Sequence, residues 1–165
     1  MAASKLQIAL TEVVATLAKK GQPQTLYAAL DRGLGKLIGH KLFTLMIFDD
    51  RQRLVERVYS NQPKAYPVGG KKPYSASTIY DDLLVRHRPC VLRDADDIKR
   101  SFADHKLILS LRCAASLHMP VVYDGRSLGI MNLLDKAGSY SDKHVAEAAP
   151  FAALLTAPFA FALRD

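Results

Sequence analysis

The sequence predicts an α+β domain in which an antiparallel sheet carries helices on its faces. Two observations lead to this fold class. Apolar residues recur at helical spacing near both ends of the chain, whereas residues 42–134 contain short apolar runs of strand length. Two of these runs meet at Asp124-Gly125, a dipeptide that favours a tight hairpin because both turn positions need a positive φ. With 165 residues, 49% of them apolar, the chain has the size and composition of one folded domain.

Two helices are expected before the sheet. The first covers residues 4–19, where leucine and valine residues recur every three or four positions. The second covers residues 24–38 and ends at Gly39, because glycine accepts the left-handed conformation that follows many helices. Gly33 and Gly35 weaken this second helix by roughly 1 kcal/mol each relative to alanine, so we expect them to allow a close approach to the sheet.

The middle of the chain is expected to alternate between strands and short helices. An apolar run at residues 42–48 pairs with an alternating run at 54–60, and a loop rich in proline, glycine and lysine follows at 61–73. A serine-capped helix, a short strand and one or two short surface helices are expected next, over residues 78–86, 89–93 and 94–105 respectively.

The hairpin that turns at residues 124–125 is the centre of the predicted sheet. On its first arm, Ser116 and His118 share one face with Pro120 and Val122, and the other face carries Leu117, Met119, Val121 and Tyr123. The second arm, residues 128–134, is almost entirely apolar, which is typical of a central strand that is covered on both faces.

The closing helix is expected over residues 141–163, and Pro150 should kink it because proline lacks an N–H. This helix carries more large apolar residues than one core-facing stripe can bury: Phe151, Leu154, Leu155, Phe159, Phe161 and Leu163. The remainder would form an apolar patch of the kind that marks an interface. Because the first helix has a matching stripe, we expect a homodimer that is formed through the terminal helices.

Charge and composition argue against several classes of protein. The net charge is +7, but the basic residues are scattered, which favours a soluble surface over a nucleic-acid or membrane site. Cys90 and Cys113 are too few for a disulfide framework and lack metal-ligand spacing. The N-terminus lacks the pattern of a secretory signal, and the uncharged residues 148–163 are too short for a membrane span. We therefore expect a cytoplasmic protein without a metal or cofactor.

Three patterns in this sequence resemble the C-terminal half of GAF domains: Ser116-x-x-Met119-Pro120-Val121, Leu128-Gly129-Ile130-Met131-Asn132-Leu133 and Tyr140-Ser141-Asp142. A weaker resemblance extends back to residues 43–49, 66–69 and 89–94, so that nearly the whole chain is covered. GAF domains are small-molecule-binding sensor modules with a profilin-like fold. The resemblance therefore implies a single domain with N-terminal helices at 4–38, a sheet and pocket at 42–134 and a closing helix that packs with the N-terminal ones.

The ligand of a GAF domain lies between the sheet and the segment that crosses it, here residues 66–102. The resemblance implies polar ligand contacts from this segment: Tyr74, Ser75, Ser77, Thr78, Asp94 and Asp97. It implies a floor from the strands: Phe48, Ser116, His118 and Met131. Each polar candidate also has a structural interpretation, because hydroxyls and carboxylates cap helices and a strand histidine is often a satisfied polar group. The ligand is unidentified, and the positive charge of the chain favours an anion.

The sequence leaves functions of other classes open. One GAF branch consists of free methionine-(R)-sulfoxide reductases, which use paired thiolates, and Cys90 and Cys113 lie on two predicted strands. The cysteine-bearing motifs of that branch are not reproduced, and Lys71-Lys72-Pro73-Tyr74 stands where a cysteine-containing loop would be expected. A small-molecule sensor without catalytic residues is therefore favoured, and a pocketless dimerisation scaffold is a further alternative. Binding of nucleic acid is the least favoured function, because no recognised motif supports it.

Overall fold

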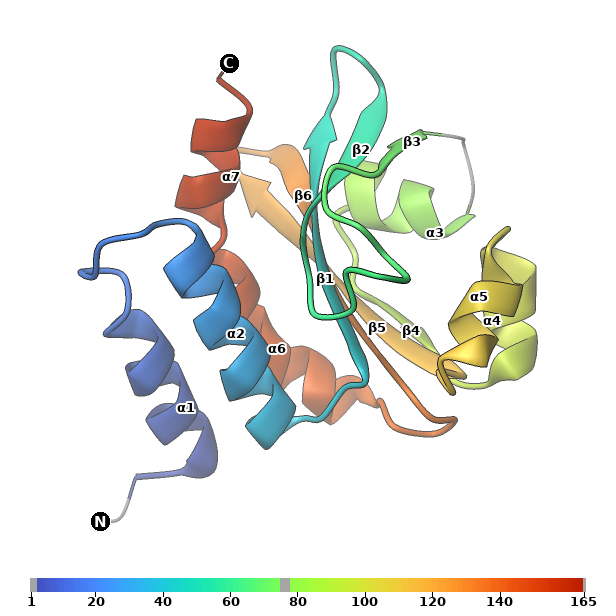
Figure 1. Ribbon diagram of the computed structural model, residues 1–165, viewed down its shortest axis with the longest axis horizontal. Coiled ribbons are helices and arrows are strands. Elements are labelled where there is room, and N and C mark those ends of the chain that lie inside the picture. Colours follow the sequence, from blue (N-terminus) through green and yellow to red (C-terminus); the bar gives the residue numbers. More distant parts are fainter. Residues whose placement is uncertain (1–2, 75–77, 165) are drawn as a thin grey trace.

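The computed structural model describes residues 3–74 and 78–164, apart from the side chain of Thr78. Within this part of the chain, an antiparallel sheet has the strand order β3-β2-β1-β6-β5-β4 (Figure 1). Its strands are β1 Leu42–Asp49, β2 Leu54–Ser60, β3 Lys71–Pro73, β4 Cys90–Leu92, β5 Ala115–Tyr123 and β6 Arg126–Asp135. The predicted α+β fold is confirmed.

The helices form two layers, one on each face of the sheet (Figure 1). The terminal helices pack together on one face: α1 Lys5–Val14, α2 Gln24–Leu37, α6 Asp142–Ala153 and α7 Thr156–Ala162. Shorter elements lie over the other face: α3 Thr78–Tyr80, the π-helical turn η1 Asp81–Val85, α4 Ala95–Ser101 and α5 His105–Ser110. In the described residues, no single helix is long and apolar enough to cross a membrane, and α6 and α7 reach that threshold only as a pair bent by 53°.

Each face of the sheet has its own core, because the central strands are buried on both sides. The helical face joins the strands to α2, α6 and α7 through large apolar side chains, among them Leu30, Leu34, Phe43, Leu45, Leu133, Phe151 and Phe159. The other face packs against the short elements through Leu42, Met46, Leu83, Ile98, Ile108, Ile130 and Leu134. Alternate residues of β1 and β6 therefore belong to different cores, as the period of a strand requires.

The Asp124-Gly125 turn adopts the geometry that the sequence predicts. Asp124 has φ 50° and Gly125 has φ 67°, so both central positions are left-handed. Gly39 likewise has φ 93° just after α2, as expected of the residue that follows a helix. These local predictions are confirmed because they depend on neighbouring residues alone.

Two β-bulges set which side chains face which core. The first bulge is in β2, opposite β1. Leu45 pairs with Tyr59 and the next β1 residue, Met46, pairs with Arg57, so Val58 of β2 is an extra residue. This bulge places Arg57 on the face of the short elements and Tyr59 on the helical face. In β6, Val122 pairs with Ser127 but Val121 pairs with Gly129, so the extra residue is Leu128. Each bulge reverses the facing of the strand beyond it.

Several predicted boundaries are wrong. The first helix ends at Val14 rather than at residue 19, because Thr16 donates its hydroxyl to the Val13 carbonyl at 2.6 Å and the chain continues in tighter turns. Gly33 allows a close approach to Val13 of α1, not to the sheet. Part of the expected loop at residues 61–73 is instead β3, which pairs with β2.

The closing helix is divided after Ala153, whereas a single helix with a kink at Pro150 was predicted. Pro150 lies inside α6, and the chain bends between α6 and α7. The new helix starts at Thr156, so Pro158 occupies its first turn. The N–H that proline lacks would have no intrahelical partner in a first turn, so Pro158 is compatible with a helix start but not with a continuous helix.

Candidate functional site

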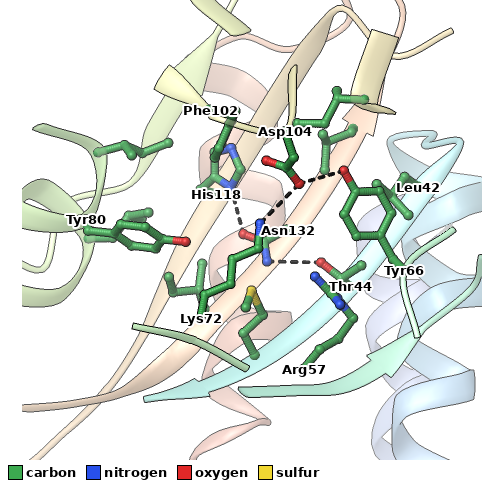
Figure 2. Close-up of a pocket in the computed structure, with 16 residues that line it drawn as sticks. Leu42, Thr44, Arg57, Tyr66, Lys72, Tyr80, Phe102, Asp104, His118 and Asn132 are labelled. Atoms are coloured by element: carbon green, nitrogen blue, oxygen red, sulfur yellow. Dashed lines mark hydrogen bonds and ion pairs between the residues drawn. The ribbon is translucent and has the colours of Figure 1, made fainter. Parts of the chain in front are cut away.

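A pocket lies between the sheet and the segments that cross it (Figure 2). Its floor comes from β1, β5 and β6, and its side and cover come from β2, β3, the loop after β2, the α3–η1 segment and the α4–α5 segment. The cavity has a volume of about 60 Å³. Most of its lining is apolar, and the polar side chains are few and gathered in two groups, one on the sheet and one at the cover. This composition is typical of a small-molecule site.

The polar group on the sheet is a row of three residues on adjacent strands. His118 of β5 pairs with Asn132 of β6, which pairs with Thr44 of β1. His118 Nδ1 lies 2.6 Å from Asn132 Oδ1, and Asn132 Nδ2 donates to Thr44 Oγ1 at 3.1 Å. Ser116, which is fully buried beside the row, lies 2.7 Å from His118 Nε2 through its hydroxyl. Figure 2 shows the row across the floor of the pocket.

These hydrogen bonds fix the protonation of His118. The amide oxygen of Asn132 can only accept, so Nδ1 carries the proton and donates, and Nε2 accepts from the Ser116 hydroxyl. Burial lowers the pKa of His118 to about 4, although the hydrogen bond to Asn132 opposes this shift. At neutral pH the floor of the pocket is therefore polar but uncharged.

Arg57 brings a positive charge to the pocket from β2. Its side chain is 6% exposed, and its guanidinium carbon lies 4.8 Å from the centre of the Tyr66 ring. Nη1 donates to the Pro67 carbonyl at 3.1 Å, whereas Nε has no hydrogen-bond partner among the described residues. Burial lowers the pKa of Arg57, which is the cost of holding a cation away from water. Arg57 is thus a buried cation with unused hydrogen-bonding capacity.

The cover of the pocket is fastened by Asp104, which joins the α4–α5 segment to β3 and to the loop that precedes β3. Lys72 of β3 approaches Asp104 at 3.1 Å, and the Tyr66 hydroxyl donates to the same carboxylate oxygen at 2.9 Å. Burial alone would raise the pKa of Asp104, but the Lys72 charge and these hydrogen bonds outweigh it and hold that pKa below its usual value. Asp104 is therefore ionised at neutral pH. Figure 2 shows Lys72 reaching across the pocket toward it.

Comparison with protein families identifies the fold. The family model described as the GAF domain matches residues 21–157. The chain belongs to the GAF domain family. The resemblance seen in the hairpin is thereby confirmed, and the family is one of small-molecule-binding sensory domains. A comparison with curated proteins gave no match.

Solved GAF structures share the whole architecture. The GAF domain of a phosphoenolpyruvate-protein phosphotransferase from Acinetobacter superposes with a TM-score of 0.79 at 14% identity, over 98% of this chain and 96% of that one. The corresponding domain from Coxiella burnetii superposes with a TM-score of 0.78 at 19% identity, over 96% of this chain and 94% of that one. A free methionine-R-sulfoxide reductase from Neisseria meningitidis, in complex with its substrate, superposes with a TM-score of 0.72 at 14% identity. The superposition covers 99% of this chain and 95% of that one. Identities this low establish the fold alone.

The structure brings only part of the predicted site together. His118 lines the pocket of this GAF domain, and Ser116 is bonded to it. Phe48 and Tyr74 pack against each other, with ring centres 5.8 Å apart, on the pocket face but outside the pocket lining. Ser75 and Ser77 lie outside the described residues, as does the side chain of Thr78.

The two aspartates predicted for the pocket cap a helix instead of lining the cavity. Asp94 accepts hydrogen bonds from the backbone of Asp96 and Asp97 at the start of α4. Asp97 accepts from the Arg93 backbone and forms an ion pair with Arg100. The carboxylates therefore serve the local structure, which is the alternative that the sequence had left open.

Met131, predicted for the floor, lies on the opposite face in the helical core. A hairpin with a two-residue turn and no bulge would place Met131 opposite His118. The bulge at Leu128 moves the register by one residue, so that Asn132 takes this position and Met131 turns away. This bulge hides the facing of Asn132 from sequence reasoning, which also missed Thr44 of β1. A usable signal existed, since both are single polar residues inside apolar strand runs.

The two cysteines of the GAF domain are placed where thiolates are disfavoured. Both are free thiols, and Cys113 is buried whereas Cys90 is half-buried. Burial raises the pKa of each, that of Cys113 to about 11. Because the thiolate is the nucleophile, these surroundings do not favour the reductase alternative. The described residues also contain no cluster of three or more histidine, cysteine or acidic side chains that could hold a metal ion.

Proposed function

We propose that this GAF domain binds a small molecule between its sheet and the crossing segments and acts as a sensory or regulatory module. The observation that carries the proposal is the row of His118, Asn132 and Thr44 on the pocket floor. Burying polar groups costs free energy unless each of them finds a hydrogen-bond partner, and the equivalent positions of the helical face are apolar. If the pocket floor served packing alone, we would expect apolar side chains there, as on the helical face.

The cover supports the same proposal, because polar contacts join its segments to one another at the edge of the pocket, in addition to the apolar core beneath them. Lys72, Tyr66 and Asp104 come from three segments and meet at one carboxylate that is partly exposed. Such contacts are weaker than a continuous apolar core, so they allow opening for ligand entry. The cavity of about 60 Å³ is below the range of about 300–1,000 Å³ that is usual for bound ligands. Binding therefore involves movement of the cover.

The proposal is tested by native mass spectrometry of the purified protein, followed by denaturing spectra and a thermal-shift screen against metabolites. We expect a small mass that is released on denaturation, or a compound that raises Tm. The pocket variant is Asn132→Leu, which keeps the approximate volume and removes the amide. The control is Gln52→Leu, the same kind of change at an exposed position outside this pocket.

A compound that stabilises the wild type and Gln52→Leu but not Asn132→Leu supports the proposal. A compound that stabilises all three proteins equally binds elsewhere and contradicts it. The absence of both a bound mass and a stabilising compound also contradicts it and favours the pocketless scaffold.

A further inference from the structure

We propose that the ligand of this pocket carries a single carboxylate, which Arg57 binds; this assignment rests on the proposed function and names the ligand class. Arg57 has unusual surroundings for a cation. Its side chain is buried, lines the cavity and forms no ion pair with a carboxylate in the described part of the chain. A buried, unpaired cation is costly, and a guanidinium has five N–H donors to satisfy. A bound anion would supply both the missing charge and the missing acceptors.

The geometry of the guanidinium indicates where the anion binds. Nη1 is occupied by the Pro67 carbonyl, and the Tyr66 ring lies 4.8 Å from the guanidinium carbon. The edge that carries Nε is left without a partner among the described residues. This edge offers two parallel N–H groups, the arrangement that a carboxylate accepts with both oxygens. In Figure 2 the guanidinium of Arg57 lies beside Thr44, at the end of the polar row.

The charges of the pocket indicate one negative charge on the ligand. Arg57 and Lys72 are the cations of the lining, Asp104 is its carboxylate, and His118 is neutral at neutral pH. Lys72 is already paired with Asp104 at 3.1 Å. One positive charge therefore remains without compensation, and a monoanion neutralises it. A phosphate with two negative charges would leave the pocket with an excess of negative charge.

The remainder of the lining indicates a compact apolar body. Met46 and Ile130 lie next to Arg57 on the sheet, since Met46 pairs with both Arg57 and Ile130. Phe102 covers His118, with ring centres 5.5 Å apart, and Ile79 adds to the apolar lining. The space is small, at about 60 Å³. A short aliphatic acid fits with little movement of the cover, whereas an aromatic acid needs the cover to open.

The first experiment compares acids with their amides, which have nearly the same shape but no charge. Propionate, butyrate and benzoate are titrated against the wild-type protein at constant ionic strength, with propionamide, butyramide, benzamide and inorganic phosphate alongside. Binding is followed by saturation-transfer NMR and by Tm. We expect at least one carboxylate to bind and to raise Tm, with its amide bound at least about tenfold more weakly, a difference of about 1.4 kcal/mol. Equal binding of acid and amide, binding of phosphate alone, or binding of no carboxylate overturns the assignment.

The second experiment uses Arg57→Gln, with Arg53→Gln as the matched control. Arg53 also stacks on a tyrosine, at 4.0 Å from the Tyr74 ring, but it lies outside the pocket. We expect Arg57→Gln to weaken carboxylate binding by about tenfold or more and Arg53→Gln to leave it unchanged. If Arg57→Gln does not fold, the comparison of acid and amide on the wild type decides. Unchanged carboxylate binding by a folded Arg57→Gln overturns the assignment.

The two proposals fail in distinguishable ways. A neutral compound that is lost in Asn132→Leu but retained in Arg57→Gln overturns the carboxylate and leaves the small-molecule function standing. A protein that binds neither the acids, the amides nor any metabolite overturns both.

Discussion

His118 is buried beneath Phe102 and still has a hydrogen-bond partner for each ring nitrogen. In the neutral form the Ser116 hydroxyl donates to Nε2, and on protonation of the ring this hydroxyl must turn to accept from Nε2. Burial opposes the charged form as well, so that the pKa falls to about 4. A single residue thus connects the polarity of the pocket floor to the stability of the protein.

His118 should make the protein less stable at mildly acidic pH. The unfolded chain, in which histidine has a pKa of 6.5, binds a proton more readily than the folded protein, in which the pKa is about 4. The contribution of neutral His118 to the free energy of unfolding is therefore fully present above pH 6.5 and is lost as the pH falls toward 4. The loss is at most about 3 kcal/mol.

Urea unfolding at about pH 7 and about pH 5 measures this effect on the wild type and on His118→Gln, whose amide does not titrate. We expect the wild type to lose more stability than the variant between the two values. Equal losses would show that other groups, such as the carboxylates, account for the acid sensitivity.

The bulge in β6 connects the hairpin to both layers of the protein. Gly129 follows the extra residue Leu128, and a Cβ at this position would overlap the Met46 carbonyl oxygen and the Phe159 ring of α7. The close approach of β6 to β1 and of α7 to the sheet therefore depends on the absence of a side chain here. The same bulge turns Asn132 into the pocket, so packing on one face and polarity on the other have a common origin.

Gly129→Ala should destabilise the protein by about 3 kcal/mol or more, at the upper end of the range for overpacking, because backbone and ring atoms must both move. The matched control is Gly125→Asn. Gly125 also has a positive φ, but no atom lies within 4 Å of its missing Cβ, and asparagine tolerates this conformation. We expect the control to cost less than about 1 kcal/mol. Similar free energies of unfolding for the two variants would contradict the close-packing argument.

The contrast between turn and bulge explains how much of the site could be predicted from the sequence. The Asp124-Gly125 turn and the two strands of its hairpin depend on local patterns, and they are where the sequence predicts them. The bulges depend on contacts with neighbouring strands and helices, which no local pattern contains. Asn132 was missed and Met131 was chosen for this reason.

The cover of the pocket was less predictable than its floor. Neither the facing nor the burial of Arg57 could be inferred from the sequence, because the bulge at Val58 separates Arg57 from Tyr59 and the loop at Tyr66 and Pro67 closes over Arg57. Lys72 and Asp104 are 32 residues apart and meet only in the folded chain. Helix caps and ligand-binding sites use the same types of residue, as at Asp94. Only the hydrogen bonds of the folded protein distinguish the two roles.

The whole molecule separates its two candidate roles between the two faces of the sheet (Figure 1). The pocket and its cover occupy one face, and the terminal helices occupy the other. β6 contributes to both, since Asn132 lies in the pocket and Met131 contacts the helical core. A displacement of β6 on ligand binding would therefore reach α7 directly. This arrangement suits a sensor whose output passes through its terminal helices.

The terminal helices should form a homodimer. They retain large exposed apolar side chains even though their inner stripes are buried: Ile8 of α1 is 50% exposed and Phe161 of α7 is 64% exposed. Burying such residues against a second copy would stabilise the dimer by about 1.5–3 kcal/mol for each side chain. We expect size-exclusion chromatography with light scattering to give the mass of a dimer for the wild type and of a monomer for the double variant Ile8→Glu, Phe161→Glu. The control is Val68→Glu, which changes an equally exposed residue on the pocket side, at 58%. A monomeric wild type, or a dimer that only Val68→Glu dissociates, would exclude the terminal helices as the interface and leave signalling to a partner that binds the cover.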